Sequence, residues 1–170
     1  MILPKQHLQS LHQSFQSLGS GLMDNLHQSQ FQPCGIDITL KEVHRYLNAG
    51  KIDFDNTERK ISNTEPMEFA NDEITLQTGA YKVLFDEYVR IPADTAAICL
   101  PRSSLLRCGA TLECALWDPG YEGRSEAMLI VRNPHGIILK RKAKIGQMIF
   151  IRLAEKASVT YEGQYLGENK

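Results

Sequence analysis

Residues 74–100 read ITLQTGAYKVLFDEYVRIPADTAAICL, and this stretch decides the fold class. It contains four short apolar or alternating runs: Ile74–Leu76, Ala80–Phe85, Tyr88–Ile91 and Ala96–Leu100. Residues that favour turns separate the runs, among them Gly79, Pro92 and Asp94. Short apolar runs bounded by Gly, Pro and Asp are typical of β-strands.

The same pattern extends in both directions from this stretch. Before it, Ile36, Ile38 and Leu40 alternate with polar residues, and after it come five more short runs: 110–116, 127–131, 137–139, 147–153 and 158–161. Many short strands at this spacing predict a mainly β protein, built as a sandwich or barrel. Residues 41–47 fit either a short helix or an extended segment, and residues 53–65 fit a polar loop with room for one short strand. The chain has no alternating strand–helix rhythm and no G-x-G-x-x-G or Walker A motif, which argues against the doubly wound nucleotide-binding folds.

Residues 1–29 form a separate N-terminal helical segment in this interpretation. The apolar residues recur every three or four positions: Leu8, Leu11, Phe15, Leu18 and Leu22. This spacing predicts an amphipathic helix, and Gly19 is expected to end it. Its apolar stripe could bind a partner or pack against the rest of its own domain, and the second use is the more common.

Size and composition limit the function classes. A length of 170 residues suits one domain, 1–170. The formal net charge is −1, and without a basic excess we expect no nucleic-acid partner. No apolar run reaches the roughly 18 residues of a membrane span, and no secretory signal pattern is present. We therefore expect a cytoplasmic protein whose four cysteines, Cys34, Cys99, Cys108 and Cys114, are buried reduced thiols.

The residues after the strand run that ends at Leu100 carry the strongest functional signal. Pro101–Arg107 reads PRSSLLR, which places two arginines and two serines within six residues. Arg binds phosphate through charge-assisted, often bidentate hydrogen bonds, and Ser hydroxyls add short donors. The serines could instead cap a short helix, but capping does not call for an arginine at both ends. The pattern predicts a phosphate site made by Arg102, Ser103, Ser104 and Arg107.

A second motif, Trp117–Gly123, reads WDPGYEG. Asp118 begins a Pro-Gly turn and lies close in sequence to Tyr121. An Asp in such a turn often bonds only its own backbone. Near a phosphate site, however, its carboxylate could orient a water molecule against a phosphorus atom. The two motifs together suggest hydrolysis of a polyphosphate.

Several other features have simpler structural interpretations. Asp37 is expected on the solvated face of its strand, with an ion pair or an indirect metal role as alternatives. Residues 133–136 read NPHG and fit a hairpin turn. Residues 158–170 are either a frayed end or a lid that orders over a ligand. The histidines lack metal-ligand spacing, and a zinc deaminase signature is absent.

Five segments, taken in order, resemble the dUTPase and dCTP-deaminase superfamily, and most of all the deaminase-like dUTPases of archaea. The matching segments are Gln32–Leu40, Pro101–Arg107, Trp117–Gly123, Ile145–Phe150 and Tyr161–Glu168. The resemblance implies a distorted β-barrel of the dUTPase jelly-roll kind, with the N-terminal helix added to it. It also implies a homotrimer with active sites shared between subunits, each closed by the tail at 158–170.

The resemblance further implies roles for the two central motifs. Arg102, Ser103, Ser104 and Arg107 match the family's phosphate-binding motif. Asp118 matches the Asp that binds the deoxyribose 3′-hydroxyl and positions the attacking water.

Roles for the remaining site residues follow from the same resemblance. Tyr121 matches the aromatic residue that packs on the deoxyribose and disfavours a 2′-hydroxyl. Gln147 matches a phosphate-contacting Gln, and Gln164 matches a base-reading Gln of the deaminase branch. The backbone around Cys114 matches the hairpin that reads the pyrimidine edge. The tail lacks the Gly-rich Phe-Gly motif of ordinary trimeric dUTPases, so we expect closure to use Tyr161 and Tyr165.

One departure separates the two branches of the family. In the deaminases a catalytic Glu stands ten residues beyond the Asp of the Asp-Pro-Gly turn, and here that position is Met128. A thioether cannot transfer protons. Glu126 should share a strand face with Met128, but its side chain would be displaced by about 6.5 Å. Because proton transfer needs a positioned group, the sequence predicts dUTP hydrolysis without dCTP deamination.

The expected reaction converts dUTP and water into dUMP and pyrophosphate. Asp118 would orient and deprotonate a water molecule for in-line attack on the α-phosphorus. Mg²⁺ would be bound mainly through the substrate phosphates, without direct protein ligands. Two alternatives stay open: a bifunctional dCTP deaminase and dUTPase, and a non-catalytic nucleotide sensor that signals through the N-terminal helix.

Overall fold

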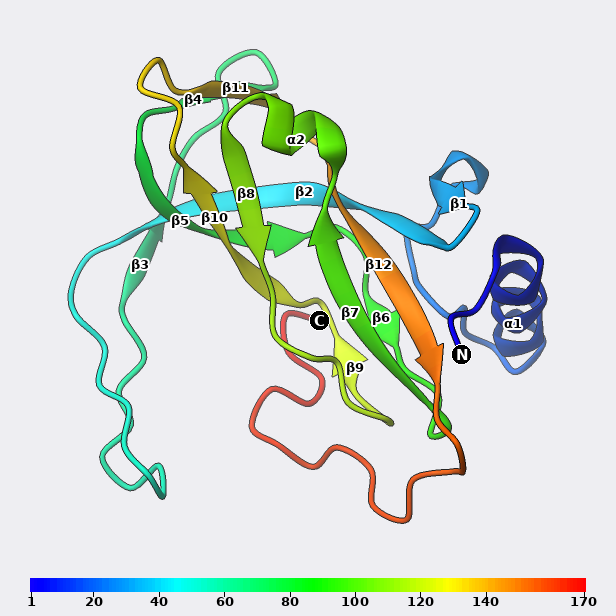
Figure 1. Cartoon of the computed structure of the whole chain (residues 1–170). Coiled ribbons are helices and arrows are strands. Elements are labelled where there is room, and N and C mark those ends of the chain that lie inside the picture. The colour runs from blue at the N-terminus through cyan, green and yellow to red at the C-terminus, as the bar shows by residue number, and fades with distance from the viewer.

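Strand β2, Gly35–Tyr46, is the longest strand and runs through the middle of the main sheet. Its first half pairs antiparallel with β12, Lys144–Arg152, and its second half pairs antiparallel with β5, Gly79–Phe85. The register with β5 shifts between Leu40 and Glu42. This irregularity lets one strand serve two parts of the sheet (Figure 1).

The main sheet nearly closes into a barrel. Its strand order is β7-β12-β2-β5-β10-β8, with β7 at Thr95–Pro101, β10 at Glu126–Val131 and β8 at Ala110–Glu113. The two end strands, β7 and β8, contact one another. The expectation of a mainly β, barrel-like fold is therefore confirmed.

Short strands complete the architecture. Strands β1, Phe31–Gln32, and β3, Thr64–Pro66, add to β2. Two further pairs lie outside the main sheet: β4, Glu73–Leu76, with β11, Ile137–Lys140, and β6, Val89–Arg90, with β9, Glu122–Gly123. The computed structural model describes all residues from Met1 to Lys170.

The structure resolves several sequence-level alternatives. Residues 41–46 are extended and belong to β2, and the loop that follows contains one short strand, β3. The predicted run at 158–161 is not a strand. Residues 133–136 do form a turn, in which the Asn133 side chain accepts the backbone N–H of His135. That turn is not a hairpin, because β11 pairs with β4 and not with β10.

Alternating side chains of the strands fill one hydrophobic core. In β10, Ala127, Leu129 and Val131 are buried while the residues between them are more exposed. Phe150 of β12 is fully buried in the same cluster. Burying each large apolar side chain contributes roughly 1.5–3 kcal/mol to folding. No helix in the structure has the length and apolar character that crossing a membrane requires.

The N-terminal segment is part of this core. Helix α1, Lys5–Ser17, places Leu8 in it, and the Leu3 backbone N–H donates to Phe150 at 2.9 Å. The helix ends at Ser17, so Leu18 is 83% exposed and does not continue the apolar stripe as expected. His12 is buried instead. The apolar face of α1 thus packs on its own domain, which is the more common of the two uses considered.

Only Cys99 meets the prediction of four buried thiols. Cys34 and Cys108 are exposed, Cys99 is buried and Cys114 is intermediate, and all four are free. Cys108 is exposed because it ends the surface helix α2, Ser103–Arg107. Cys34 lies in the turn between β1 and β2.

Candidate active site

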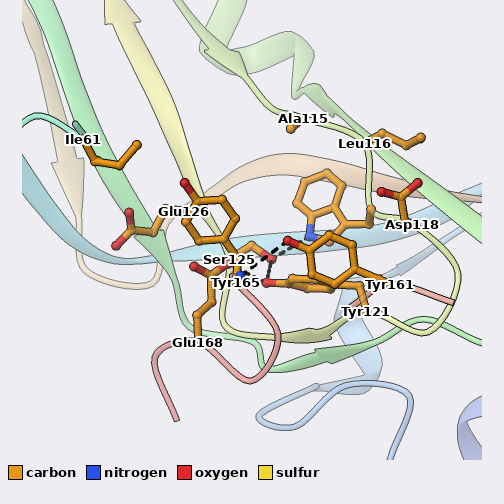
Figure 2. A pocket seen from close by; sticks show the side chains of 11 residues that line it. Ile61, Ala115, Leu116, Asp118, Tyr121, Ser125, Glu126, Tyr161, Tyr165 and Glu168 are labelled. Carbon is orange, nitrogen blue, oxygen red and sulfur yellow. Dashed lines mark hydrogen bonds between the residues drawn. The ribbon is translucent and has the colours of Figure 1, made fainter. Parts of the chain in front are cut away.

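A pocket of about 350 Å³ lies where the C-terminal tail crosses the end of the barrel. The segment after β8 supplies Ala115 to Asp118, and the chain beyond it supplies Tyr121, Ser125 and the first residue of β10, Glu126. The tail supplies Tyr161, Tyr165 and Glu168. Ile61, from the long arm between β2 and β3, completes the lining. Figure 2 shows the tyrosines gathered in the centre, with Asp118 and Glu126 on opposite sides.

The backbone fixes Asp118 at this pocket. Trp117 pairs with Ala97 of β7 through two hydrogen bonds of 2.9 Å. The Tyr121 N–H then closes the Asp-Pro-Gly turn by donating to the Asp118 carbonyl at 3.1 Å. Gly120 in this turn has φ +81°, and a Cβ there would lie 2.6 Å from the Thr160 Cβ. The turn therefore requires glycine both for its backbone conformation and for the close passage of the tail.

The Asp118 carboxylate is available for chemistry. Its residue is partly exposed and lines the pocket. Figure 2 draws no hydrogen bond between this carboxylate and the other lining residues. Both oxygens can thus accept hydrogen bonds from a water molecule or from a ligand hydroxyl.

A chain of hydrogen bonds crosses the floor of the pocket. The Trp117 indole Nε1–H donates to Ser125 Oγ at 2.5 Å, and Ser125 Oγ lies 2.9 Å from the Tyr121 hydroxyl. The Tyr121 hydroxyl donates to Glu168 Oε1 at 2.7 Å. Burial raises the pKa of the Tyr121 hydroxyl well above its usual range, so it stays protonated. Burial likewise raises the pKa of Glu168, opposed by the bond from Tyr121.

The tail is held against the pocket by its backbone. The Tyr161 N–H donates to the Pro119 carbonyl at 2.8 Å, and Arg124 N–H donates to the Glu168 carbonyl at 3.0 Å. The Tyr161 ring meets Tyr121 edge-on, with centroids 5.5 Å apart and an interplanar angle of 72°. Tyr161 and Tyr165 therefore lie where closing residues were expected.

Gln164 has a different environment from its tail neighbours. It is exposed and its Oε1 accepts a hydrogen bond from Arg59 of the arm between β2 and β3. It does not line the pocket. The structure thus places Gln164 at a contact between the tail and the arm.

The predicted phosphate-binding residues form a second group, apart from this pocket. Arg102 directly precedes α2, and Ser103, Ser104 and Arg107 lie on that exposed helix. None of the four lines the pocket. In Figure 1, α2 lies at the upper end of the barrel while the tail runs along the lower end. Buried Leu105 anchors α2 and leaves the polar side chains facing outward.

Asp37 belongs to this second group, and its expected place on a solvated face is wrong. It is 1% exposed, and its carboxylate lies 3.3 Å from Arg102 Nε and 3.3 Å from Lys144 Nζ. Gln32 Nε2 donates to it at 2.9 Å. The alternation of Ile36 and Ile38 predicted two faces correctly, but charged partners cover the polar face. The ion-pair alternative for Asp37 is therefore the one observed.

Gln147 and Cys114 lie close to these groups. Gln147 is opposite Asp37 on β2 and Leu100 on β7, so it shares the sheet region that carries Arg102. Cys114 follows β8 and packs against the core. Its thiol is close enough to Cys99 that, together with burial, it raises the pKa of the Cys99 thiol above the usual range. Cys114 comes directly before the segment that lines the pocket.

The position that distinguishes the two branches has the expected strand geometry. Met128 and Glu126 both alternate with the buried residues of β10, so they share a face. Glu126 lines the pocket and forms an ion pair with Lys82 at 2.8 Å, whereas Met128 does not line it.

Ser125 and Glu168 are site residues to which the sequence motifs gave no role. Ser125 lies just beyond the Trp117–Gly123 motif, and Glu168 ends the matching segment Tyr161–Glu168 without a predicted function. Only the fold brings their side chains to the Tyr121 hydroxyl.

The donor set sets limits on a metal site. No group of three or more His, Cys, Asp or Glu side chains is placed to hold a metal ion. Mg²⁺ commonly binds through one or two carboxylates plus substrate phosphates. A magnesium ion that arrives with a polyphosphate therefore fits these residues better than a resident all-protein site.

Comparisons with known proteins identify the family of this chain. A family model described as dCTP deaminase-like matches residues 2–153. The chain is similar to the probable deoxyuridine 5′-triphosphate nucleotidohydrolase of Methanosarcina mazei, with 52% identity over 143 residues and 84% of each chain covered. The corresponding protein of Methanosarcina barkeri is 46% identical over 169 residues, covering 99% of this chain and 98% of that one.

Two further proteins are similar to this chain. The deoxyuridine 5′-triphosphate nucleotidohydrolase of Methanocaldococcus jannaschii is 43% identical over 146 residues, covering 85% of this chain and 92% of that one. The crystal structure of 2′-deoxycytidine 5′-triphosphate deaminase from Agrobacterium tumefaciens superposes with a TM-score of 0.66. It covers 88% of this chain and 47% of that one at 20% identity, so it supports the fold alone. With a family model along almost its whole length and relatives matched over most of theirs, the chain belongs to the dCTP deaminase-like family.

Proposed function

We propose that this chain is a dUTP diphosphatase, which hydrolyses dUTP to dUMP and pyrophosphate. The relatives that match along most of their length carry the name deoxyuridine 5′-triphosphate nucleotidohydrolase. One of them aligns over 169 residues, so the similarity includes the tail that closes the pocket. The observation that carries the proposal is Asp118, a carboxylate without an intramolecular partner in the pocket, beside the buried Tyr121.

The chemistry assigned to Asp118 is general base catalysis. Its carboxylate accepts a proton from a water molecule while the water oxygen forms a bond to the α-phosphorus. The bond from the α-phosphorus to the oxygen that bridges to the β-phosphorus breaks, and pyrophosphate leaves with that oxygen. Bound magnesium would supply charge neutralisation on the triphosphate. Arg102, Arg107 and the serines of α2 hold the phosphates through charge-assisted bonds.

The substrate site is assigned to two copies of the chain, in a homotrimer. The phosphate-binding residues around α2 and the pocket that holds Asp118 lie at different ends of one copy. A second copy can supply the missing half of each site. The arm between β2 and β3 supports this assembly, because Ile52 and Phe54 expose 75% and 104% of their surface. Apolar side chains gathered on such an arm usually contact another surface.

Deamination of dCTP is the second candidate, because Glu126 lines the same pocket. Two observations favour hydrolysis alone. Met128 occupies the position of the deaminase carboxylate, and Glu126 is held by Lys82 at 2.8 Å. The ion pair with Lys82 occupies one oxygen of the Glu126 carboxylate.

A nucleotide panel tests the proposal. The purified protein with Mg²⁺ is incubated separately with dUTP, dCTP, dTTP and UTP, and pyrophosphate and ammonia are measured. The proposal requires pyrophosphate from dUTP and no ammonia from dCTP. Ammonia from dCTP would establish the bifunctional activity, and the Glu126→Gln variant would then show whether Glu126 supplies the proton.

A further inference from the structure

We propose that Glu168 is a positioning residue for the substrate sugar: from the closed tail it holds the Tyr121 hydroxyl and so fixes the ring that selects deoxyribose. The inference rests on the proposed function, in which the Tyr121 ring packs on the sugar. It adds a residue of the tail, and a contact that forms only when the tail is closed, to the determinants of specificity.

The hydrogen-bond chain that ends at Glu168 has a single direction. The Trp117 indole can only donate, so Ser125 Oγ accepts its N–H. The Ser125 hydroxyl proton is then free to point at the Tyr121 oxygen, 2.9 Å away. The Tyr121 proton points at Glu168 Oε1, 2.7 Å away. Every donor is used once, and the chain is complete only if an acceptor stands at position 168.

The backbone beneath the pair is shaped for this contact. A Cβ on Gly123 would lie 2.6 Å from the Tyr121 hydroxyl oxygen and 3.1 Å from Glu168 Cγ. Gly123 also forms a parallel β-bridge with Glu168, and its neighbour Arg124 donates to the Glu168 carbonyl at 3.0 Å. The missing side chain of Gly123 thus leaves the space in which the phenol and the carboxylate meet.

The tail contacts Tyr121 at two points. Glu168 holds the hydroxyl, and Tyr161 meets the ring edge-on at 5.5 Å. When the tail is open, only Ser125 still bonds the hydroxyl. Glu168 therefore couples closure of the tail to the orientation of the Tyr121 ring. The bond from the Tyr121 hydroxyl to Glu168 is drawn in Figure 2. Orientation of this ring matters because an aromatic face set against the sugar ring leaves little space for a 2′-hydroxyl.

Two variants of Glu168 test whether its role is to accept the hydrogen bond from Tyr121 or only to fill space. Glu168→Ala removes the acceptor, while Glu168→Gln keeps a carbonyl oxygen that can accept the phenol proton. We expect Glu168→Ala to lower the ratio of kcat/KM for dUTP to that for UTP by about tenfold, the scale of one lost hydrogen bond to a charged group. Glu168→Gln should keep the ratio within about threefold of the original protein. Glu162→Ala, at an exposed tail position, is the matched control and should leave it unchanged.

A double-mutant cycle tests whether Glu168 acts through Tyr121. Tyr121→Phe removes the hydroxyl that Glu168 accepts from and keeps the ring. Adding Glu168→Ala to it should therefore change the ratio of kcat/KM for dUTP to that for UTP less than twofold further. Circular dichroism of each variant checks that the fold is kept. The inference is wrong if Glu168→Ala keeps the original ratio, if Glu168→Gln is as impaired as Glu168→Ala, or if the two effects multiply. If the original protein fails to hydrolyse dUTP, the proposed function is at fault rather than the role of Glu168.

Discussion

Replacing Asp37 by Asn should destabilise the protein, because three donors surround its carboxylate. Arg102 and Lys144 each lie 3.3 Å from it, and Gln32 donates at 2.9 Å. Asn keeps the volume but has one acceptor oxygen, and its amide N–H₂ would face a donor. Arg102 and Lys144 would also lose the counter-charge of Asp37, which is itself only 1% exposed.

The magnitude follows from the exposure of the partners. Losing hydrogen bonds to a charged group costs about 1.5–3 kcal/mol each, and a broken buried ion pair costs about 3–5 kcal/mol. The side chains of Arg102 and Lys144 are 36% and 28% exposed, so water recovers part of this loss. We expect the free energy of unfolding to fall by about 2–3 kcal/mol, with Tm lower by about 4–12 °C.

Urea denaturation and thermal melting measure this loss. Asp72→Asn is the control, since Asp72 is 81% exposed, contacts only Arg141 at 3.6 Å, and has a φ of 62° that Asn also tolerates. Asp72→Asn should change the free energy of unfolding by no more than about 0.5 kcal/mol. If Asp37→Asn is as mild as the control, the carboxylate does not organise Arg102 and Lys144.

Three further predictions concern other parts of the site and the fold. Ser125→Ala should lower the free energy of unfolding by about 1–3 kcal/mol in urea titrations, because it leaves the buried Trp117 indole N–H without its acceptor. A loss no larger than that of an exposed Ser→Ala change, such as Ser158→Ala, would contradict this. Arg107→Gln should leave Tm unchanged, since Arg107 is exposed. It should raise KM for dUTP about tenfold or more, because a charged contact with phosphate is lost. An unchanged KM would show that Arg107 is not part of the phosphate site. Burial lowers the pKa of His12, so the folded state favours the neutral ring. The free energy of unfolding should therefore be highest above the ordinary pKa of 6.5 and should fall as the pH drops through the lowered pKa. His12→Leu should flatten that fall in urea titrations from pH 8 to about pH 5, and an equally steep fall in the variant would place the titrating group elsewhere.

Sequence patterns predicted most of the sheet because its strands obey local rules. Runs such as Ala80–Phe85 and Ala96–Leu100 combine β-formers with turn residues at both ends, and each became a strand. Ser158–Tyr161 has similar composition but is not a strand. Its backbone finds only a single partner, Pro119, rather than a neighbouring strand. Strand formation at a chain end depends on such a partner, which the sequence alone does not reveal.

The motifs predicted residues that share one pocket better than they predicted the surroundings of those residues. Asp118, Tyr121, Tyr161 and Tyr165 were predicted from the sequence and line one pocket. The burial of Asp37 was missed because alternation predicts two faces of a strand but not what covers them. In this fold the charged partners of Asp37 come from residues 102 and 144, far away in sequence.

The contacts of the tail depend on the whole fold in the same way. Glu168 reaches Tyr121 across 47 residues of sequence, and Gln164 reaches Arg59 across 105. No local pattern encodes either pairing. The separation between the predicted phosphate residues around α2 and the pocket beside the tail likewise depends on the fold rather than on the motifs.

The most direct test of the central claim is the turnover of dUTP by Asp118→Asn. An amide of the same shape cannot accept the proton of the attacking water, so kcat should fall by roughly 10²–10⁴-fold. Binding of dUTP, measured by calorimetry with Mg²⁺, should stay within about tenfold, because the phosphate contacts are untouched. A kcat within tenfold of the original protein would contradict the account and place the catalytic base at another residue.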